Sequence, residues 1–448
     1  MLIPAALWAS GTLIYETGSK ASAQAGAFTA RADDASAVFY NPAGMAFAKN
    51  MQFSFNTTYI NTDIKYQSPS LGQYKQQAKN FFIPSVFFTM PLTDKLAFGV
   101  YGGAPFNLAT DWSDQFPGRF ASRHAKIVTY NLRPALSIKF NDYNALAIGV
   151  DYYDSEINLI RALNTSALST AINPNRYPSP PYPPGIPYYQ YSEGTIDTWV
   201  RDQAWGWNIS YMWKMEPWSF GAQYRSRAKF DYTGHSSFEV SPYVEPLHAY
   251  FPGQTTHLSL TSVPAVAVMG FAYDNKKFTV EFDVQWTEWS VWDHATGKFG
   301  NPTSFGGSYI VPPEQEFVFE WGNTWCWRLG FGYKLNEYWE LRWGLLYDQA
   351  PVPDQTLSPV LPDQDRWSVQ FGTGYEKNGF GFDWYLMYLK FKNANIATEN
   401  HNRYYATGLP YVYLPGQGVI YPTEYAVTPD GKYKGTALLA GFQINFKF

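Results

Sequence analysis

Residues 438–448 read LLAGFQINFKF, and apolar and polar side chains alternate along them. Successive side chains of a β-strand point to opposite faces, so one face of this strand meets an apolar environment and the other a polar one. The apolar face carries Leu438, Ala440, Phe442, Ile444, Phe446 and Phe448, and the polar face carries Gln443, Asn445 and Lys447. The stretch therefore predicts a strand at a boundary between oil and water.

The same alternation recurs near residues 122–140. Val128, Tyr130, Leu132, Leu136, Ile138 and Phe140 lie opposite Thr129, Asn131, Arg133, Ser137 and Lys139. A shift of one residue would turn Arg133 toward the apolar side, at a cost of about 2–4 kcal/mol at the midplane of a bilayer. The pairing register of this strand is therefore strongly specified.

About fourteen such stretches follow one another, joined in turn by tight and by long connections, a rhythm typical of an all-β, antiparallel transmembrane β-barrel. Asn141-Asp142 and Asn336-Glu337 are examples of the tight turns. The long connections, rich in Pro and Tyr, are expected at 173–191, 241–253, 294–313 and 395–430. We expect the strands near 51–66, 78–92, 95–111, 122–140, 143–162, 195–215, 216–232, 255–274, 276–292, 316–336, 338–351, 363–377, 379–395 and 432–448.

The composition agrees with a barrel. Aromatic residues make up 19% of the 448 residues and charged residues only 16%, while the mean hydropathy is −0.31. No apolar run reaches the roughly 18 residues of a membrane helix. A net charge of −4 gives no electrostatic reason to expect a nucleic-acid partner.

The chain before the first strand differs from the rest. We interpret residues 1–9 as the remnant of an export signal, residues 10–47 as a hatch inside the lumen, and residues 48–448 as the barrel with its long outer loops. Residues 10–47 are crowded with Ala, Gly and Ser and do not alternate. A barrel of this size needs something to fill its interior.

Two features of this hatch are candidate gate residues. Asp33 and Asp34 would need partners inside a barrel, and lumen-facing Arg133, Arg328 and Arg342 are candidates. The stretch Asn41-Pro42-Ala43 begins a turn, because Pro42 fixes φ and Asn41 can bond forward to the backbone. On this reading it is the rigid foot of the hatch.

At this point the sequence resembles the FadL family of outer-membrane transporters for long-chain fatty acids, which includes toluene and hydrocarbon channels. The resemblance extends over most of the chain. It rests on Ala32-Asp33-Asp34 with Asn41-Pro42-Ala43, Leu108-Ala109-Thr110-Asp111-Trp112, Trp286-Thr287-Glu288-Trp289-Ser290, Thr324-Trp325-Cys326-Trp327-Arg328-Leu329-Gly330, and Asp348-Gln349-Ala350-Pro351-Val352-Pro353 followed by Leu361-Pro362-Asp363-Gln364-Asp365-Arg366.

The resemblance implies a fourteen-stranded barrel in the bacterial outer membrane, closed by an N-terminal hatch. It also implies passive uptake, with a hydrophobic ligand captured outside, the hatch moving, and sideways release through a kinked third strand. Gly102, Gly103 and Pro105 suit such a kink, because they combine missing side chains with a missing backbone donor. Alternatively, they mark the outer end of the strand.

A fatty acid cargo would need a cation for its carboxylate. Arg133, Arg328, Arg342 and Lys139 face the lumen by strand parity and are the candidates. The competing interpretation is that they pair with Glu281, Asp283, Glu340 or the hatch carboxylates. We expect a hydrophobic small molecule as partner, outer-membrane lipid and lipopolysaccharide as surroundings, and a monomer.

Two rival functions stay open at the level of sequence. An outer-membrane lipid hydrolase would need a nucleophile with a histidine base, and the six histidines have no recognisable nucleophile motif beside them. A general diffusion porin would need an open lumen, which the small-residue segment argues against. We therefore expect no enzymatic activity and no cofactor. No His and carboxylate cluster with ligand spacing predicts a metal site.

Overall fold

The computed structural model describes residues 11–69, 72–77, 80–164, 193–240, 248–259, 262–305, 308–396, 412–414, 418–420 and 431–448. The predicted export-signal remnant and most of the proline-rich connections at 173–191 and 395–430 lie outside these residues. Within the described part, no helix is long and apolar enough to cross a membrane.

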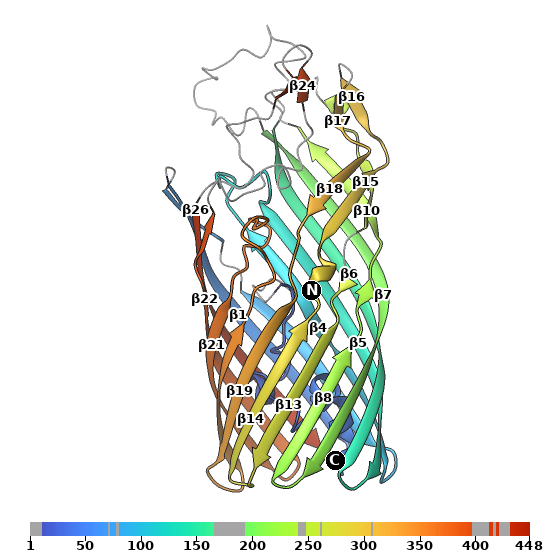
Figure 1. Cartoon of the computed structure of the whole chain (residues 1–448), viewed down its shortest axis with the longest axis vertical. Coiled ribbons are helices and arrows are strands. Elements are labelled where there is room, and N and C mark those ends of the chain that lie inside the picture. The colour runs from blue at the N-terminus through green and yellow to red at the C-terminus, as the bar shows by residue number, and fades with distance from the viewer. Residues whose placement is uncertain are drawn as a thin grey trace.

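Fourteen antiparallel strands close into one barrel (Figure 1), which confirms the predicted fold class. The last strand pairs with the first through Phe446 opposite Phe53, so the sheet has no free edge at this seam. In order of pairing, the strands are β1 (Gln52–Ser68), β3 (Phe81–Pro91), β4 (Leu96–Asp111), β5 (His124–Asn141), β6 (Asn144–Asn164), β7 (Glu193–Met215), β8 (Trp218–Arg225), β13 (Val266–Asp274), β14 (Phe278–Thr287), β19 (Thr324–Lys334), β20 (Trp339–Asp348), β21 (Arg366–Lys377), β22 (Phe380–Phe391) and β26 (Gly431–Lys447).

Because side chains alternate along each strand, polar ones face the lumen and apolar ones face outward. Ile148, on β6, is 63% exposed and points outward, whereas Asp151, on the same strand, is 1% exposed and points into the lumen. On β5 the expected faces hold from Tyr130 to Ile138. Val128 was expected on the outer face and is instead buried, because the regular alternation of β5 breaks at Val128 and Thr129.

Four strands of the barrel continue upward as separate elements, at the end drawn at the top of Figure 1. The expected uninterrupted strands at 216–232, 255–274, 276–292 and 316–336 are each broken, and part of the expected loop at 294–313 is a strand. Pairs β10–β7, β10–β11, β11–β15 and β15–β18 extend the wall. The added elements are β9 (Ala228–Lys229), β10 (Tyr232–Glu239), β11 (Gln254–Ser259), β12 (Ser262–Val263), the short helix η3 (Trp289–Val291), β15 (His294–Phe299) and β18 (Glu314–Val318).

Shorter strands lie at the same upper end of the barrel. Strand β2 (Gly72–Lys75) folds back on β1, and β23 (Ala394–Ile396) continues alongside β26. Two hairpins are formed by β16 (Thr303–Phe305) with β17 (Ser308–Val311) and by β24 (Val412–Leu414) with β25 (Gly418–Ile420). The opposite, lower end has the short turns.

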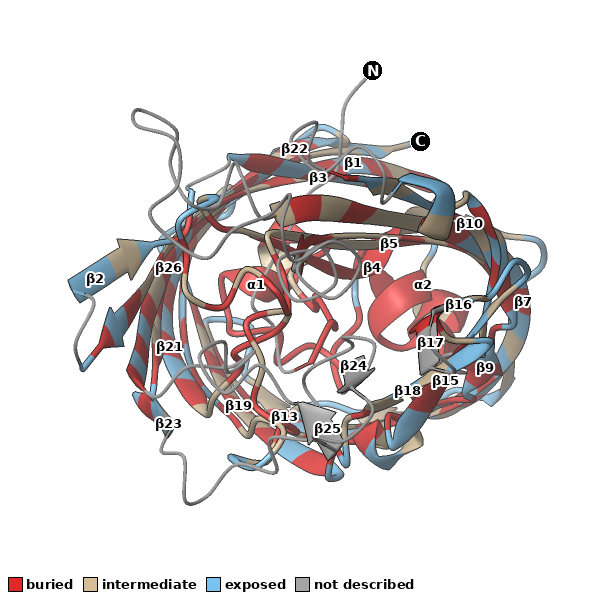
Figure 2. Ribbon diagram, turned by 90° about the horizontal axis from the view of Figure 1, so that it is seen from above, coloured by how far each residue is buried: buried red, intermediate tan, exposed pale blue. Residues whose placement is uncertain are grey.

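The N-terminal segment lies inside the barrel, as the view from above shows (Figure 2). We call residues 11–47 the hatch segment. It contains α1 (Ser19–Ser22), α2 (Ala37–Tyr40) and the 3-10 helix η1 (Pro42–Phe47), which are short and almost wholly buried. Its small side chains let this irregular backbone fold against the wall on all sides.

Strand β4 leaves its neighbour halfway up the wall. Its ladder with β3 ends at Gly102, and its ladder with β5 shifts register between Gly103 and Phe106. The ladder between β5 and β6 also lacks a pair at Pro134, which has no backbone donor to give. The wall is therefore locally interrupted on both sides of β4 and β5.

Candidate ligand path and hatch

An apolar cavity of about 110 Å³ lies in the upper half of the lumen, against β15 and β18. Trp292 and Trp321 stack in its wall with ring centroids 4.5 Å apart, and Phe319 meets Trp292 edge-on at 5.6 Å. Burial of apolar surface stabilises a guest by about 25 cal/mol per Å². The cavity therefore suits the non-polar body of a small molecule. Its aliphatic lining comprises Leu108, Ile127, Ile157, Leu258, Val352 and Leu361.

Within the described part of the chain, one buried cation in this lining lacks a carboxylate partner. Arg161, on β6, is 7% exposed, and its Nη2 donates to Gln315 Oε1 at 3.2 Å. No charged partner within the described ranges compensates its burial. The other cation in the lining, Lys126, lies 3.3 Å from Glu156. Arg161 still carries its charge at neutral pH and is available to an anionic group.

The cavity continues downward to the hatch segment. A smaller space of about 20 Å³ shares Ile127, Ile157 and Trp292 with the upper cavity, and Thr12 contributes to its lining. Phe106 of β4 lines it as well. The apolar space therefore ends where the hatch segment meets the interrupted part of β4.

Here the start of the hatch segment pairs with β4 as an extra strand. Ile14 N–H donates to Pro105 O at 2.7 Å, and Asn107 N–H donates to Thr12 O at 2.8 Å. These bonds use backbone groups of β4 near its register shift. The hatch segment therefore occupies the inner side of the wall where β4 departs from β3.

A buried carboxylate holds the first described residue of this segment. Asp363 Oδ2 accepts the Gly11 N–H at 2.8 Å. Gly11 has a φ of +63°, and a Cβ there would lie 2.4 Å from the Trp289 ring. Burial raises the pKa of Asp363 to about 8, although Arg366 lowers it in part. Asp363 is a hydrogen-bonding latch whose charge depends on pH.

Glycines of the barrel wall receive the hatch segment. A Cβ on Gly221 would lie 2.0 Å from Thr29 O, and one on Gly344 would lie 2.6 Å from Ala25 N. Backbone of the hatch segment thus approaches backbone of the wall directly, which only glycine permits. Hatch atoms also lie within 3 Å of the Cβ position at Gly99, Gly330 and Gly372.

Two wall carboxylates bind the backbone of the hatch segment. Asp283 Oδ2 accepts the N–H groups of Phe28 and Thr29 at 3.1 and 3.0 Å. Glu281 Oε1 accepts the Ala30 N–H at 2.6 Å. Both carboxylates are fully buried. Removing either would leave buried N–H groups without partners, a cost of about 1–3 kcal/mol per group.

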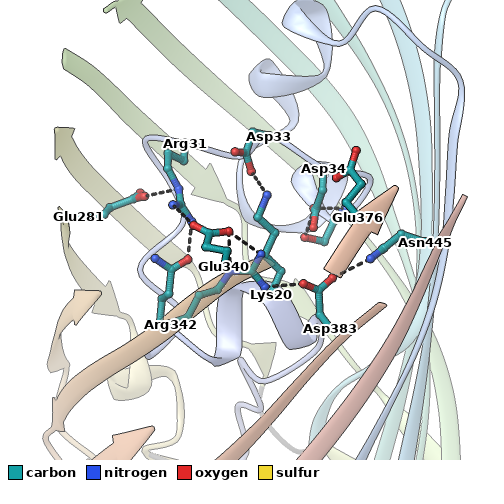
Figure 3. A network of polar contacts seen from close by, with 12 residues as sticks. Lys20, Arg31, Asp33, Asp34, Glu281, Glu340, Arg342, Glu376, Asp383 and Asn445 are labelled. Atoms are coloured by element: carbon teal, nitrogen blue, oxygen red, sulfur yellow. Dashed lines mark hydrogen bonds and ion pairs between the residues drawn. The ribbon is translucent and has the colours of Figure 1, made fainter. Parts of the chain in front are cut away.

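Below the hatch segment, a polar cavity of about 470 Å³ is lined by charged residues from both the segment and the wall. Figure 3 shows this network. Lys20 lies 2.7 Å from Asp33, and Arg31 lies 3.6 Å from Glu281 and 4.0 Å from Glu340. On the wall, Arg342 bridges Glu340 and Asp383, and Asp383 accepts a hydrogen bond from Asn445 at 2.6 Å. The lower lumen is therefore hydrophilic, and ion pairs connect the hatch segment to the wall there.

The four cations predicted to hold a ligand carboxylate lie elsewhere than the apolar cavity. Arg133 is bound to Asp151 and donates to Phe39 O, Arg342 belongs to the network just described, and Arg328 lies over the Tyr15 ring at 4.2 Å. Lys139 sits at the lower end of β5, where its N–H donates to Lys95 O. Their role toward a ligand stays a prediction.

The predicted partners of Asp33 and Asp34 were wrong. Asp33 pairs with Lys20 of its own segment, and Asp34 accepts the Ser36 N–H at 2.8 Å. The reason is that the hatch segment brings its own cations, Lys20 and Arg31, which the parity argument did not consider.

The stretch Asn41-Pro42-Ala43 attaches the segment to the wall. Asn41 Nδ2 donates to Thr29 O at 2.7 Å and to Tyr211 O at 3.1 Å. Ala43 N–H donates to Ser210 Oγ at 3.0 Å, and Pro42 starts η1. These contacts fit a rigid foot, whose part in gating stays a prediction.

Sequence reasoning missed Arg161 and Asp363. Arg161 shares the parity of the inward residues Asp151 and Ser155, so the alternation of β6 carried the signal. It was passed over because it stands at the end of the expected strand. Asp363 lies within a motif quoted for the family resemblance, but nothing local shows that it reaches Gly11, more than 300 residues away in the chain.

Comparisons with known proteins agree with this architecture. The sequence profile described as "Outer membrane protein transport protein (OMPP1/FadL/TodX)" matches residues 1–448. The "Long-chain fatty acid transport protein" of Salmonella typhi is 24% identical over 392 residues, covering 84% of this chain and 86% of that protein. The "Outer membrane protein P1" of Haemophilus influenzae strain Rd is 24% identical over 396 residues, covering 82% of each chain.

Solved structures share the fold. A FadL homologue from Pseudomonas aeruginosa has a TM-score of 0.78 at 22% identity and covers 98% of this chain and 100% of its own. The Pseudomonas putida toluene transporter TodX has a TM-score of 0.67 at 15% identity, with 98% of both chains covered. At these identities the structural likeness establishes the architecture.

Proposed function

The chain belongs to the OMPP1/FadL/TodX family of outer membrane transport proteins, and from this premise we propose that it is a channel for passive uptake of hydrophobic small molecules. The cargo is a long-chain fatty acid or a hydrocarbon, as named for the relatives. It enters from the upper, extracellular end and rests in the apolar cavity. Movement of the hatch segment then lets it leave sideways into the membrane.

The observation that carries this proposal is the contrast inside one lumen. The cavity beside Trp292 and Trp321 is almost entirely apolar, whereas the space below the hatch segment is lined by ion pairs. A hydrophobic cargo gains free energy by entering the first and loses it by entering the second, since desolvating charges is costly. A straight path downward is therefore unfavourable for it.

A sideways exit avoids the charged region. The ladder of β4 with β3 ends at Gly102, and the apolar space reaches Phe106 just above that point. The hatch segment is hydrogen-bonded to β4 at Pro105 and Asn107. Release of these bonds would free the inner side of the interrupted wall. We therefore propose that the lateral opening lies at Gly102, Gly103 and Pro105.

We propose further that the protein is not an enzyme, in keeping with relatives that are named as transport proteins and channels. The check is incubation of the purified protein with phospholipid. Release of free fatty acid above that of a boiled sample would contradict this part of the proposal.

The uptake function is tested by placing a charge in the apolar cavity. Leu361 lines the cavity and is 4% exposed, so Leu361→Asp puts a carboxylate where the cargo would lie. Leu335, which is 53% exposed in a lower turn, gives the matched control Leu335→Asp. Oleate and toluene uptake are measured in cells that lack their own transporter.

We expect Leu361→Asp to reduce uptake of both compounds about tenfold or more, because a buried unpaired charge is strongly unfavourable. Leu335→Asp should transport like the unaltered chain. Heat-modifiable migration on gels verifies that both variants form barrels. Full uptake by a folded Leu361→Asp barrel would contradict the proposal.

A further inference from the structure

We propose that Arg225 and Arg328 form a second, inner binding site for a carboxylate group, set against the hatch segment and separate from Arg161. The inference rests on the proposed function, because the carboxylate belongs to a fatty acid that has entered the lumen. It concerns how far the charged end of the cargo travels.

The two arginines are buried, and most of their guanidinium nitrogens have no hydrogen-bond partner among the described residues. Arg225, the last residue of β8, is 2% exposed, and none of its three guanidinium nitrogens has a hydrogen-bond partner among the described residues. Arg328, on β19, is also 2% exposed, and its Nε and Nη1 are equally unpartnered within those ranges. Buried guanidinium groups are ordinarily paired and hydrogen-bonded, so this pair is exceptional.

Both guanidinium groups converge on one ring of the hatch segment. The Cζ atom of Arg328 lies 4.2 Å from the centre of the Tyr15 ring, and that of Arg225 lies 5.8 Å from it. Arg225 also lies 5.0 Å from the centre of the Phe39 ring. Strands far apart in the sequence thus deliver two cations to the same place. Aromatic faces compensate a cation only in part, by about 0.5–2 kcal/mol.

The nearest carboxylates bind other groups, although Asp283 Oδ1 has no hydrogen-bond partner among the described residues. Asp151 takes Arg133 together with the side-chain amides of Asn131 and Asn208. Asp283, which is adjacent to Arg328 in the ladder, takes two backbone N–H groups of the hatch segment through Oδ2. Neither is within ion-pair distance of Arg225 or Arg328. One further anion would balance this region.

The apolar space ends at residues that neighbour these cations along the chain. The small cavity that continues from the upper one is lined by Thr12, and Tyr15 follows three residues later. Val263 lines the same cavity, and Val266, a little further along the chain, is paired with Arg225 in the ladder. Neither arginine lines this cavity, so the hatch segment must move before the carboxylate of a fatty acid in the apolar space reaches Arg225. Charge-assisted bonds to two guanidinium groups are the strong kind.

The site is tested by comparing a carboxylate with a matched alcohol. Laurate and dodecanol are titrated calorimetrically into the purified full-length protein. The variants are Arg225→Gln, Arg328→Gln and Arg161→Gln, with Arg201→Gln as control, since Arg201 is exposed and pairs with Asp154 on the surface. Crystals soaked with 12-bromolaurate report where the chain ends, and heat-modifiable migration on gels verifies folding.

We expect two binding events for laurate and one for dodecanol. Arg225→Gln and Arg328→Gln should each weaken only the second laurate event about tenfold or more, because hydrogen bonds to charged groups are lost. Arg161→Gln should weaken the other event, and Arg201→Gln neither. A single laurate event that is unchanged in folded Arg225→Gln and Arg328→Gln would overturn the inner site while leaving the proposed function intact. Absence of binding for both compounds would contradict the proposed function itself.

Discussion

The upper and lower halves of the lumen are built on the same wall but from opposite side chains. Above the hatch segment, Trp, Phe, Leu and Ile surround an apolar cavity, in whose described lining Arg161 is the one cation without a carboxylate partner. Below it, inward positions carry Arg, Glu and Asp joined in a network. The outer face of the wall is apolar along the lower strands, whereas the upper continuations expose polar side chains such as His257, Lys298 and Glu316. One barrel wall can therefore offer a hydrophobic cargo two opposite environments through its inward residues.

The hatch segment is the boundary between these halves, and removing it should have the largest effect. Deletion of residues 10–40 is expected to leave an assembled barrel whose two halves are joined by water. Single-channel conductance in planar bilayers should rise by an order of magnitude or more, since a barrel of this width has room for an aqueous channel. Conductance equal to that of the full chain would show that the segment does not separate the halves.

The charged network of the lower half should be the next most sensitive feature. Arg31→Met removes the hatch cation beside Glu281 and Glu340 and leaves a buried carboxylate uncompensated. We expect the attachment of the hatch segment to weaken by about 3–5 kcal/mol. Hydrogen exchange of the Phe28, Thr29 and Ala30 amides measures this.

The matched control for that variant is Arg201→Met, because Arg201 is half exposed in its pair with Asp154. Surface pairs contribute at most about 1 kcal/mol. Equal exchange rates in the two variants would mean that the lower network does not hold the hatch segment.

The stability of the contact between Asp363 and Gly11 should depend on pH. Burial holds the pKa of Asp363 at about 8, well above that of an unfolded Asp. A raised carboxyl pKa stabilises the folded latch fully at low pH, and this stabilisation is lost as pH rises from about 4 through 8. The protection factor of the Ile14 amide, which corrects for the base-catalysed rise of intrinsic exchange, should therefore fall as pH rises from about 4 through 8. Asp363→Asn should remove the pH dependence of the Ile14 protection factor. A pH dependence that persists in this variant would contradict the role of Asp363 as the titrating group.

The upper half is probed most finely at Arg161. Arg161→Gln should reduce oleate uptake about tenfold, because a charge-assisted hydrogen bond is lost, and should leave toluene uptake unchanged. Transport of both compounds at the original rate would indicate that the cargo is a hydrocarbon or that its charge is held elsewhere in the lumen. An equal loss of oleate and toluene uptake would mean that Arg161 shapes the cavity and does not bind the carboxylate.

The wall was largely predictable from the sequence, because period-two alternation is a local signal that each strand carries by itself. The expected ranges coincide closely with β1, β4 and β26. The upper continuations of β8, β13, β14 and β19 were misjudged as uninterrupted strands or as loops. There the alternation is interrupted, and pairing is decided by neighbours that arrive from other parts of the chain.

The candidate site was harder to predict, since its contacts join residues hundreds of positions apart. Parity places Arg133, Arg328 and Arg342 in the lumen, but it does not show that one is paired with Asp151 and another lies over Tyr15. The division of the lumen into two halves depends on where the hatch segment docks. That docking is fixed by wall glycines such as Gly221, whose role is invisible without the opposing backbone.

Permeability of proteoliposomes tests the central claim most directly, because it compares the two halves in one preparation. Liposomes containing the unaltered protein are offered a fluorescent fatty acid and, separately, arabinose. The account predicts faster transfer of the fatty acid than in empty liposomes and no swelling in arabinose. Swelling in arabinose at the rate of a general porin, with no acceleration of the fatty acid, would contradict it.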